Sequence, residues 1–384
     1  MPDPGRRVLL AIAILCANAA VPAAAQPEDV PRYSERPLDQ ASYVELARRW
    51  QAYIDEHGAT AEALVNLGMA YDYAKELEAA LVAARQAVEL EPDDPRALEF
   101  LGKMLLTYGD DEEAALEVLE RCRRVAPDYE HGLTTLAATY LRRGDLHHAE
   151  ETMRTVFQRR LIAHPLQDYA YNMLVGLPAG AVLITSGDND TFPVLALQAG
   201  MEFRPDVVVL NRSLLNVPGY ATAMFERHGN IAPDHDIDGH EVRMVDGHPT
   251  LLSIALIEAL IERGDVPVYV SASALEPFHG QEFEGQLEGI NLRVGESGMG
   301  ADDSARLLLS TYRMDSATDW TFAWSLVPGI AQLMRNYVAA MGRLADREET
   351  SAETRTALLD RAEEIARFHG MERMETVIRA LRQR

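Results

Sequence analysis

Residues 64–71 read LVNLGMAY, residues 98–105 read LEFLGKML and residues 133–140 read LTTLAATY. The first two octamers begin 34 residues apart and the last two 35 residues apart. Each has leucine at its first and fourth positions and a small residue at its fifth. Repetition at this period is typical of stacked helix pairs, in which each pair buries its apolar face against the next. The sequence therefore predicts a helical solenoid in the N-terminal half of the chain.

This pattern resembles the tetratricopeptide repeat over about residues 61–160. Small residues such as Gly68, Ala80 and Ala87 allow antiparallel helices to approach closely, and Pro92 ends the second helix of a pair. Stacked repeats form a concave groove on which a peptide or a partner helix can lie. The resemblance implies a protein or peptide partner bound through this repeat groove.

The repeat pattern also gives an interpretation of the segment before the array and of the cysteine within it. Residues 41–57 look like an additional, degenerate helix pair ahead of the array. Cys122 takes the position that Ala87 holds one repeat earlier, so we interpret it as a small core residue and not as a reactive thiol.

The composition of the 384-residue chain excludes several classes of protein. Hydrophobic residues make up 47% and charged residues 25%, as in ordinary globular proteins and unlike disordered ones. Lys+Arg number 36 against 60 for Asp+Glu, a net charge of -24, which repels phosphate backbones and anionic headgroups. Nucleic acid is therefore not an expected partner.

Residues 1–25 have the order of a secretory signal peptide: a basic start at Arg6, an apolar run, and three alanines ending at Ala25. We expect cleavage after Ala25 and a periplasmic or secreted protein without a membrane span. Cys16 lies in the apolar run, and whether it is lipidated stays open. With the signal peptide removed, Cys122 has no partner for an intramolecular disulfide.

A second kind of domain is predicted after the repeats. Residues 181–185, 206–210 and 266–270 are short apolar runs typical of buried strands, and helices are expected at about 193–199 and 250–263. Strands that alternate with helices indicate parallel strands between two helical layers. The predicted fold class is α plus α/β: a tetratricopeptide-like solenoid, then a three-layer α/β domain with mainly parallel strands and a C-terminal helical segment.

Polar side chains follow each of these strands. Because ligands bind beyond the carboxyl ends of parallel strands, the sequence predicts one shared ligand crevice there. The candidate residues are Asp188, Asn189, Asp190, Thr191, Asn211, Ser213 and Ser271.

Two interpretations of the acidic pair in this loop stay open. Asp188 and Asp190 flank one residue, a spacing that can hold a hard divalent cation through oxygen ligands. Alternatively, Asp190 or Thr191 caps a helix entered through Pro193, which is the favoured interpretation. No resident cofactor is expected beyond this candidate cation.

The stretch GDNDTFP at 187–193, with RPDV at 204–207 and NRSLLN at 211–216, carries a further resemblance. From about residue 177 onward the chain resembles the soluble C-terminal region of bacterial multi-pass membrane proteins related to protein O-mannosyltransferases. The resemblance implies the fold and an extracytoplasmic setting. Those relatives have a transferase membrane domain upstream, where this chain has helical repeats, so no catalytic role is carried over.

The acidic loop around residue 236 is a weaker candidate for a metal site. Asp234, Asp236 and Asp238 alternate like the start of a calcium loop, but Val245 stands where a bidentate glutamate is needed. The nearby histidines His235, His240 and His248 are not arranged as a zinc site.

The rest of the chain contains neither a nucleophile elbow nor a phosphate-binding loop nor a dinucleotide fingerprint. Helices are predicted at about 324–346, 352–369 and 371–382. The expected organisation is a signal peptide at 1–25, an extended polar leader at 26–40, the repeat domain at 41–165, the α/β domain at 170–318 and C-terminal helices at 319–384.

These observations favour an exported, non-catalytic binding or scaffold protein. Its repeats bind a peptide or protein, and its α/β domain recognises a glycan or a glycosylated polypeptide, with an envelope glycosylation component as a candidate partner. The alternative is a metal-dependent enzyme that acts on glycans or lipid-linked sugars through Asp188 and Asp190.

Overall fold

The computed structural model describes residues 25–32, 36–109, 111–231, 242–245, 248–275, 282–295, 298–324 and 328–383. Most of the predicted signal peptide and the aspartates at 234, 236 and 238 lie outside these residues, as do His235 and His240. Among the described residues, no helix is long and apolar enough to cross a membrane.

The first part is an antiparallel helical array, as predicted. Its helices are α1 (Gln40–His57), α2 (Ala61–Ala74), α3 (Leu77–Leu90), α4 (Pro95–Thr107), α5 (Glu112–Val125), α6 (Glu130–Arg142) and α7 (Leu146–Gln158). Side chains of Thr60, Asp94, Asp111 and Asp145 cap the starts of α2, α4, α5 and α7 by accepting a backbone N–H. The predicted helix pair at 41–57 is wrong: the segment is the single helix α1, because no turn residue interrupts it before Gly58.

Glycine permits the close approach of the repeat helices. A Cβ atom added at Gly102 in α4 would lie 2.5 Å from Cγ and 2.7 Å from Cδ2 of Leu119 in α5. Cys122 is fully buried, as predicted for a core position, and burial raises the pKa of its thiol to about 12. The thiol is therefore protonated and unreactive at neutral pH.

We predict that Gly102→Ala lowers the free energy of unfolding by about 2 kcal/mol, because the added methyl group forces α4 and α5 apart. Gly342→Ala is the matched control, since its Cβ would lie 3.7 Å from Leu381 of the neighbouring helix, an ordinary van der Waals contact. Urea unfolding followed by circular dichroism measures both. A Gly102→Ala variant as stable as Gly342→Ala would show that the interface has room for a methyl group.

The second part contains a mixed sheet of five strands in the order β2-β1-β5-β7-β6. The strands β1 (Val182–Thr185), β2 (Val208–Asn211) and β5 (Val268–Ser271) are parallel, as predicted. The hairpin of β6 (Gly285–Glu288) and β7 (Asn291–Val294) adds two antiparallel strands that the sequence analysis missed. A separate two-stranded ladder joins β3 (Val242–Val245) to β4 (His248–Leu251).

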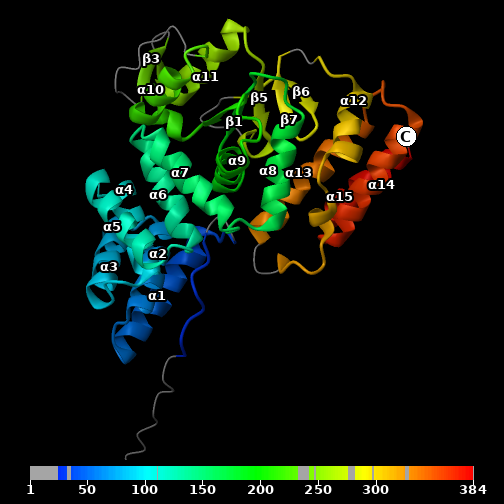
Figure 1. The fold of residues 1–384 in the computed structure, drawn as a ribbon. Coiled ribbons are helices and arrows are strands. Elements are labelled where there is room, and N and C mark those ends of the chain that lie inside the picture. Colours follow the sequence, from blue (N-terminus) through cyan, green and yellow to red (C-terminus); the bar gives the residue numbers. More distant parts are fainter. Residues whose placement is uncertain are drawn as a thin grey trace, which may run out of the picture.

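Helices cover both faces of the sheet, which gives the predicted three layers (Figure 1). The apolar core on one face includes residues of α8 (His164–Val175), α9 (Asp188–Met201), α12 (Ala301–Arg306), α13 (Pro328–Ala345), α14 (Ala352–Phe368) and α15 (Glu372–Arg382). The other packs against α10 (Pro218–Arg227) and α11 (Leu252–Arg263). Short 3₁₀ segments occupy Leu214–Asn216, Ala272–Ala274 and Asp315–Thr318, and Leu307–Thr311 forms a π-helical turn.

The repeats pack directly on the α/β part. Helix α7 lies along α9, and α6 contacts α10. Side chains of α6, including Leu136 and Tyr140, belong to the same apolar core as the strand residues Ile184 and Val270. Residues of α4 and α6 and residues that follow β1 and β5 line one crevice, so this side of the array faces the carboxyl ends of these strands.

Helix α9 begins earlier than predicted. Its start was placed at Pro193, but the helix runs from Asp188, and Pro193 lies inside its second turn. The backbone N–H of Gly187, ahead of the helix, is satisfied by the side chain of Asp190 at 2.7 Å. An acidic side chain that accepts a hydrogen bond from the backbone ahead of a helix marks the start of that helix. The prediction used only the preference of proline for the first helical turn, and so it placed the start too late.

Candidate functional site

The strand order brings the predicted polar tips together. Strand β1 lies between β2 and β5, with Thr185 opposite Asn211 and Ile184 opposite Val270. The connection from β1 leads to one side of the sheet and the connection from β2 returns to the other side. The tips of β1 and β5 lie side by side, and residues that follow both strands line one crevice, the usual ligand position in such sheets.

Asp190 is buried at the base of this crevice, where it joins two strand tips. It is 1% exposed. Its Oδ2 accepts hydrogen bonds from the Ser186 amide at 3.1 Å and the Ser271 hydroxyl at 2.7 Å, and from the Ser273 hydroxyl. Its Oδ1 accepts from the Gly187 amide at 2.7 Å. Both oxygens are therefore engaged by the protein itself, which gives Asp190 a structural role in shaping the loop.

A second set of buried contacts ties in the tip of β2. The Asn211 carboxamide donates to the Thr191 hydroxyl at 2.9 Å, and that hydroxyl is 2.9 Å from the hydroxyl of Thr185. Asn211 and Thr191 are 7% and 2% exposed, too buried to contact a ligand directly. Ser213 is exposed and lies outside the crevice lining.

Asp188 has the opposite environment from Asp190. Its side chain is exposed, and among the described residues no group pairs with its carboxylate. Asn189 lines the same space. Desolvation by the surrounding walls raises the pKa of Asp188. The positive charge of Lys103 opposes this rise, and the negative charge of Asp190 adds to it. Asp188 thus faces open space with a charge that its surroundings disfavour.

The repeats form the opposite wall. Lys103 of α4 pairs with Asp72 at 2.7 Å, and its Nζ lies 5.0 Å from the ring centroid of Tyr73. His131, Thr134 and Thr135 of α6 continue this wall. The sequence analysis missed these residues because repeat spacing predicts the helices but not the part of the molecule that the groove faces.

Helix α13 completes the enclosure. Arg335 is exposed toward the crevice, and no acidic group of the described residues pairs with its guanidinium. The crevice has a volume of about 820 Å³ and is open to solvent. Its lining residues are Arg32, Pro37, Tyr73, Glu99, Lys103, Leu106, Thr107, His131, Thr134, Thr135, Ala138, Gly187, Asp188, Asn189, Asp190, Phe192, Ala272, Ser273, Gly329, Gln332, Leu333, Arg335 and Asn336.

Within the described part of the chain, no three histidine, cysteine or carboxylate side chains converge as a metal site. Asp188 contributes one uncommitted carboxylate to the crevice, because the oxygens of Asp190 already accept hydroxyl and amide protons. A cation at this loop would rest on Asp188 with neutral oxygen ligands such as that of Asn189.

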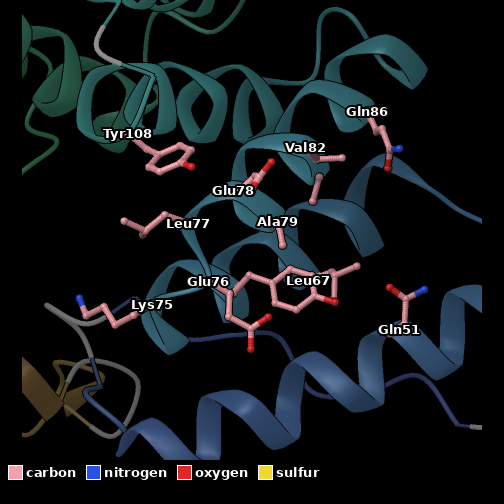
Figure 2. A pocket seen from close by; sticks show the side chains of 12 residues that line it. Gln51, Leu67, Lys75, Glu76, Leu77, Glu78, Ala79, Val82, Gln86 and Tyr108 are labelled. Carbon is pink, nitrogen blue, oxygen red and sulfur yellow. The ribbon is translucent and has the colours of Figure 1, made fainter.

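A second hollow, of about 770 Å³, lies among α1, α2 and α3 (Figure 2). Leu67, Leu77 and Val82 give it an apolar floor, and Glu76 and Lys75 lie at its edge. None of the residues predicted to bind a ligand lines it.

We predict that Asp188→Asn leaves the protein as stable as the wild type at neutral pH, or stabilises it. Folding raises the pKa of this carboxyl. Its protonated form therefore stabilises the folded state at a pH below the pKa of the unfolded chain, and this stabilisation is lost as the pH rises through the pKa of the folded protein. The substitution removes the charge that is disfavoured at pH 7. Melting temperatures compared at pH 7 and pH 3.5 test this, since any gain at pH 7 should vanish at pH 3.5. A clear loss of stability at pH 7 would show that the carboxylate has a structural partner.

Comparison with known proteins identifies both parts of the chain by similarity. A tetratricopeptide repeat model matches residues 61–94, and the model described as TMEM260-associated domain 2 matches residues 166–259. The crystal structure of the MamA protein is similar over 50% of this chain and 85% of that chain, with 17% identity and a TM-score of 0.30. No curated protein matches. The repeat match confirms the helical array and supports a protein-binding scaffold.

Proposed function

We propose that this protein is an exported, non-catalytic scaffold whose crevice between the repeats and the strand tips holds a glycan or the glycosylated part of a polypeptide. The observation that carries the proposal is the shared lining of this crevice. A single space of about 820 Å³ is lined from the repeat groove, the strand tips and α13. Its size falls within the range of ligand sites.

The chemistry of the lining favours a polyhydroxylated ligand. Each sugar hydroxyl both donates and accepts a hydrogen bond, so a matching site needs acceptors and donors side by side. Asp188 offers acceptors, Arg335 offers donors, and Asn189 and Gln332 offer both. Phe192 and Tyr73 add apolar surface for the carbon face of a sugar ring. Asp188 and Arg335, which have no ion-pair partner in the described part of the chain, would hydrogen-bond to the ligand.

The setting of this function is part of the proposal. The secretory pattern of residues 1–25 supports an envelope or extracellular location. The resemblance to the region that accompanies O-mannosyltransferase-type membrane domains supports a separate envelope glycosylation component as partner. Copurification from envelope extracts, followed by identification of the bound proteins, tests this partner. Recovery of the protein together with a membrane glycosyltransferase supports the proposal, and recovery of the protein without one contradicts it.

The alternative function is an enzyme that acts on glycans or lipid-linked sugars with a divalent cation. The observation in its favour is the raised pKa of Asp188, since carboxyls shifted by their surroundings in a cleft are frequent at catalytic sites. Asp188 would be the cation-binding residue, because Asp190 is fully engaged in the loop.

A thermal-shift panel of sugars and divalent cations separates the two functions. We expect sugars to raise the melting temperature of the wild type without a cation, and Asp188→Asn to abolish that rise. Ser213→Ala is the matched control, because Ser213 is exposed at a neighbouring strand tip outside the crevice. A rise that requires both cation and sugar would favour the enzyme. Identical responses of the wild type and Asp188→Asn would contradict both functions.

A further inference from the structure

The segment that precedes α1 lies inside the repeat groove. Residues 25–32 have no regular secondary structure, as predicted for an extended leader, and they make ordered contacts with the repeats. Val30 is 3% exposed, and Pro27 is also buried. Glu28 and Asp29 between them are exposed, and the Asn66 carboxamide of α2 donates to Asp29 Oδ1 at 3.1 Å. Pro27 and Val30, three residues apart, are thus buried against the repeats, as the anchoring residues of a bound peptide are.

The repeats bind the backbone of this leader. The amide of Val30 donates to the carboxamide oxygen of Asn66 in α2 at 2.8 Å, and Trp50 Nε1 of α1 donates to the carbonyl of Glu28 at 3.1 Å. These contacts involve main-chain atoms, so any extended peptide can make them.

The groove also binds the side chain of Arg32. Arg32 forms two hydrogen bonds with Glu99 of α4, at 2.6 Å and 3.3 Å, and a third with the Tyr129 hydroxyl at 3.0 Å. Glu99 is 1% exposed, and Thr135 donates to it at 3.1 Å. Burial pushes the pKa of Glu99 upward, but the Arg32 guanidinium outweighs it and holds the pKa below its usual value. A buried carboxylate of this kind requires a cation, and a planar guanidinium satisfies it best.

We propose that residues 26–32 are an intrachain ligand that closes the repeat groove, and that a partner protein enters by supplying an extended segment with an apolar residue followed two positions later by arginine. The inference rests on the proposed scaffold function and adds its regulation: the partner surface is occupied in the isolated chain. Arg32 also lines the glycan crevice. Exchange of the leader for a partner segment therefore changes one wall of that crevice.

The tether makes the leader a strong competitor. An occupant attached by a short linker acts at an effective concentration in the millimolar range. A free peptide of the same sequence must therefore bind the wild type at least tenfold more weakly than it binds a chain whose leader has lost its anchors.

A labelled peptide of residues 26–32, QPEDVPR, tests this by fluorescence anisotropy on the full chain. We expect the double variant Val30→Ser with Arg32→Ala to bind it at least tenfold more tightly than the wild type. Arg36→Ala, on the exposed part of the leader, should match the wild type. A peptide with Arg32→Ala should not bind. Equal binding of QPEDVPR to the wild type and the double variant, or equal binding of the two peptides, would overturn the proposal.

Hydrogen exchange on the unaltered wild-type chain gives a second readout that does not depend on how the variant folds. The Val30 amide, which donates to the Asn66 side chain, should exchange through local opening, faster than the amides of α2. A Val30 amide as slow as those of α2 would overturn the proposal, because the segment would then be a permanent part of the fold. The sugar panel is independent of this result, so failure of the intrachain ligand and failure of the glycan site are separable.

Discussion

Replacing Asp190 with asparagine should lower the free energy of unfolding by about 3 kcal/mol. The carboxylate accepts from two backbone amides and from the hydroxyls of Ser271 and Ser273. Asparagine keeps one accepting oxygen and places an NH₂ group, which cannot accept, against the remaining donors. The side chain is 1% exposed, so water cannot replace the lost acceptor.

Urea unfolding by circular dichroism measures this loss, with Asp188→Asn as the matched control two residues away. The control has the same chemical change at a carboxylate without partners among the described residues, and we expect no loss of stability. If Asp190→Asn stays within about 0.5 kcal/mol of the wild type, the change behaves like an ordinary surface substitution. The loop would then not depend on Asp190.

Asn172→Ala should have an effect of similar size, about 3 kcal/mol, at the junction of α8 with the C-terminal helices. Asn172 is fully buried. Its Nδ2 donates to the Arg313 carbonyl at 2.8 Å and the Tyr337 hydroxyl at 2.7 Å, and its Oδ1 accepts from the Arg313 amide at 2.7 Å. Alanine leaves all three of these groups without a partner.

Asn336→Ala provides the comparison for this substitution. Asn336 is half-buried and donates one hydrogen bond, to the Tyr169 hydroxyl at 2.8 Å. Its loss should cost about 1 kcal/mol, the usual net value of one hydrogen bond. Denaturant midpoints of the two variants decide the matter: equal midpoints would mean that Asn172 contributes no more than a single hydrogen bond.

The sequence predicted the elements that depend on local or repeated patterns. The octamers at 64–71, 98–105 and 133–140 lie in α2, α4 and α6, because leucine and glycine spacing reflects helix contacts within each repeat. Short apolar runs predicted β1 and β5 for a similar reason, since buried parallel strands need apolar residues on both faces. The hairpin of β6 and β7 escaped prediction because residues 285–288, GQLE, are exposed or half-buried over most of their length and are not strongly apolar.

The candidate site was predicted only on one side. Polar residues after β1 and β5 predicted a crevice at the strand tips, and the structure places Asp188, Asn189 and Asp190 in its lining. The wall formed by Lys103 and His131 depends on how the array docks through α7 on α9, which no local pattern encodes. The burial of the leader also depends on tertiary packing and not on a local pattern. Asn66 and Glu99 lie on separate repeats, and they contact residues 29–32 only in the folded array.

Calorimetric titration of the best sugar from the panel, against single substitutions on opposite walls of the crevice, tests the central claim most directly. Asp188→Asn alters the strand-tip wall and Lys103→Gln alters the repeat wall. The account predicts that each weakens binding at least tenfold, about 1.4 kcal/mol, while Ser213→Ala leaves it unchanged. Binding that survives either substitution intact would contradict a single site shared by the two parts of the molecule.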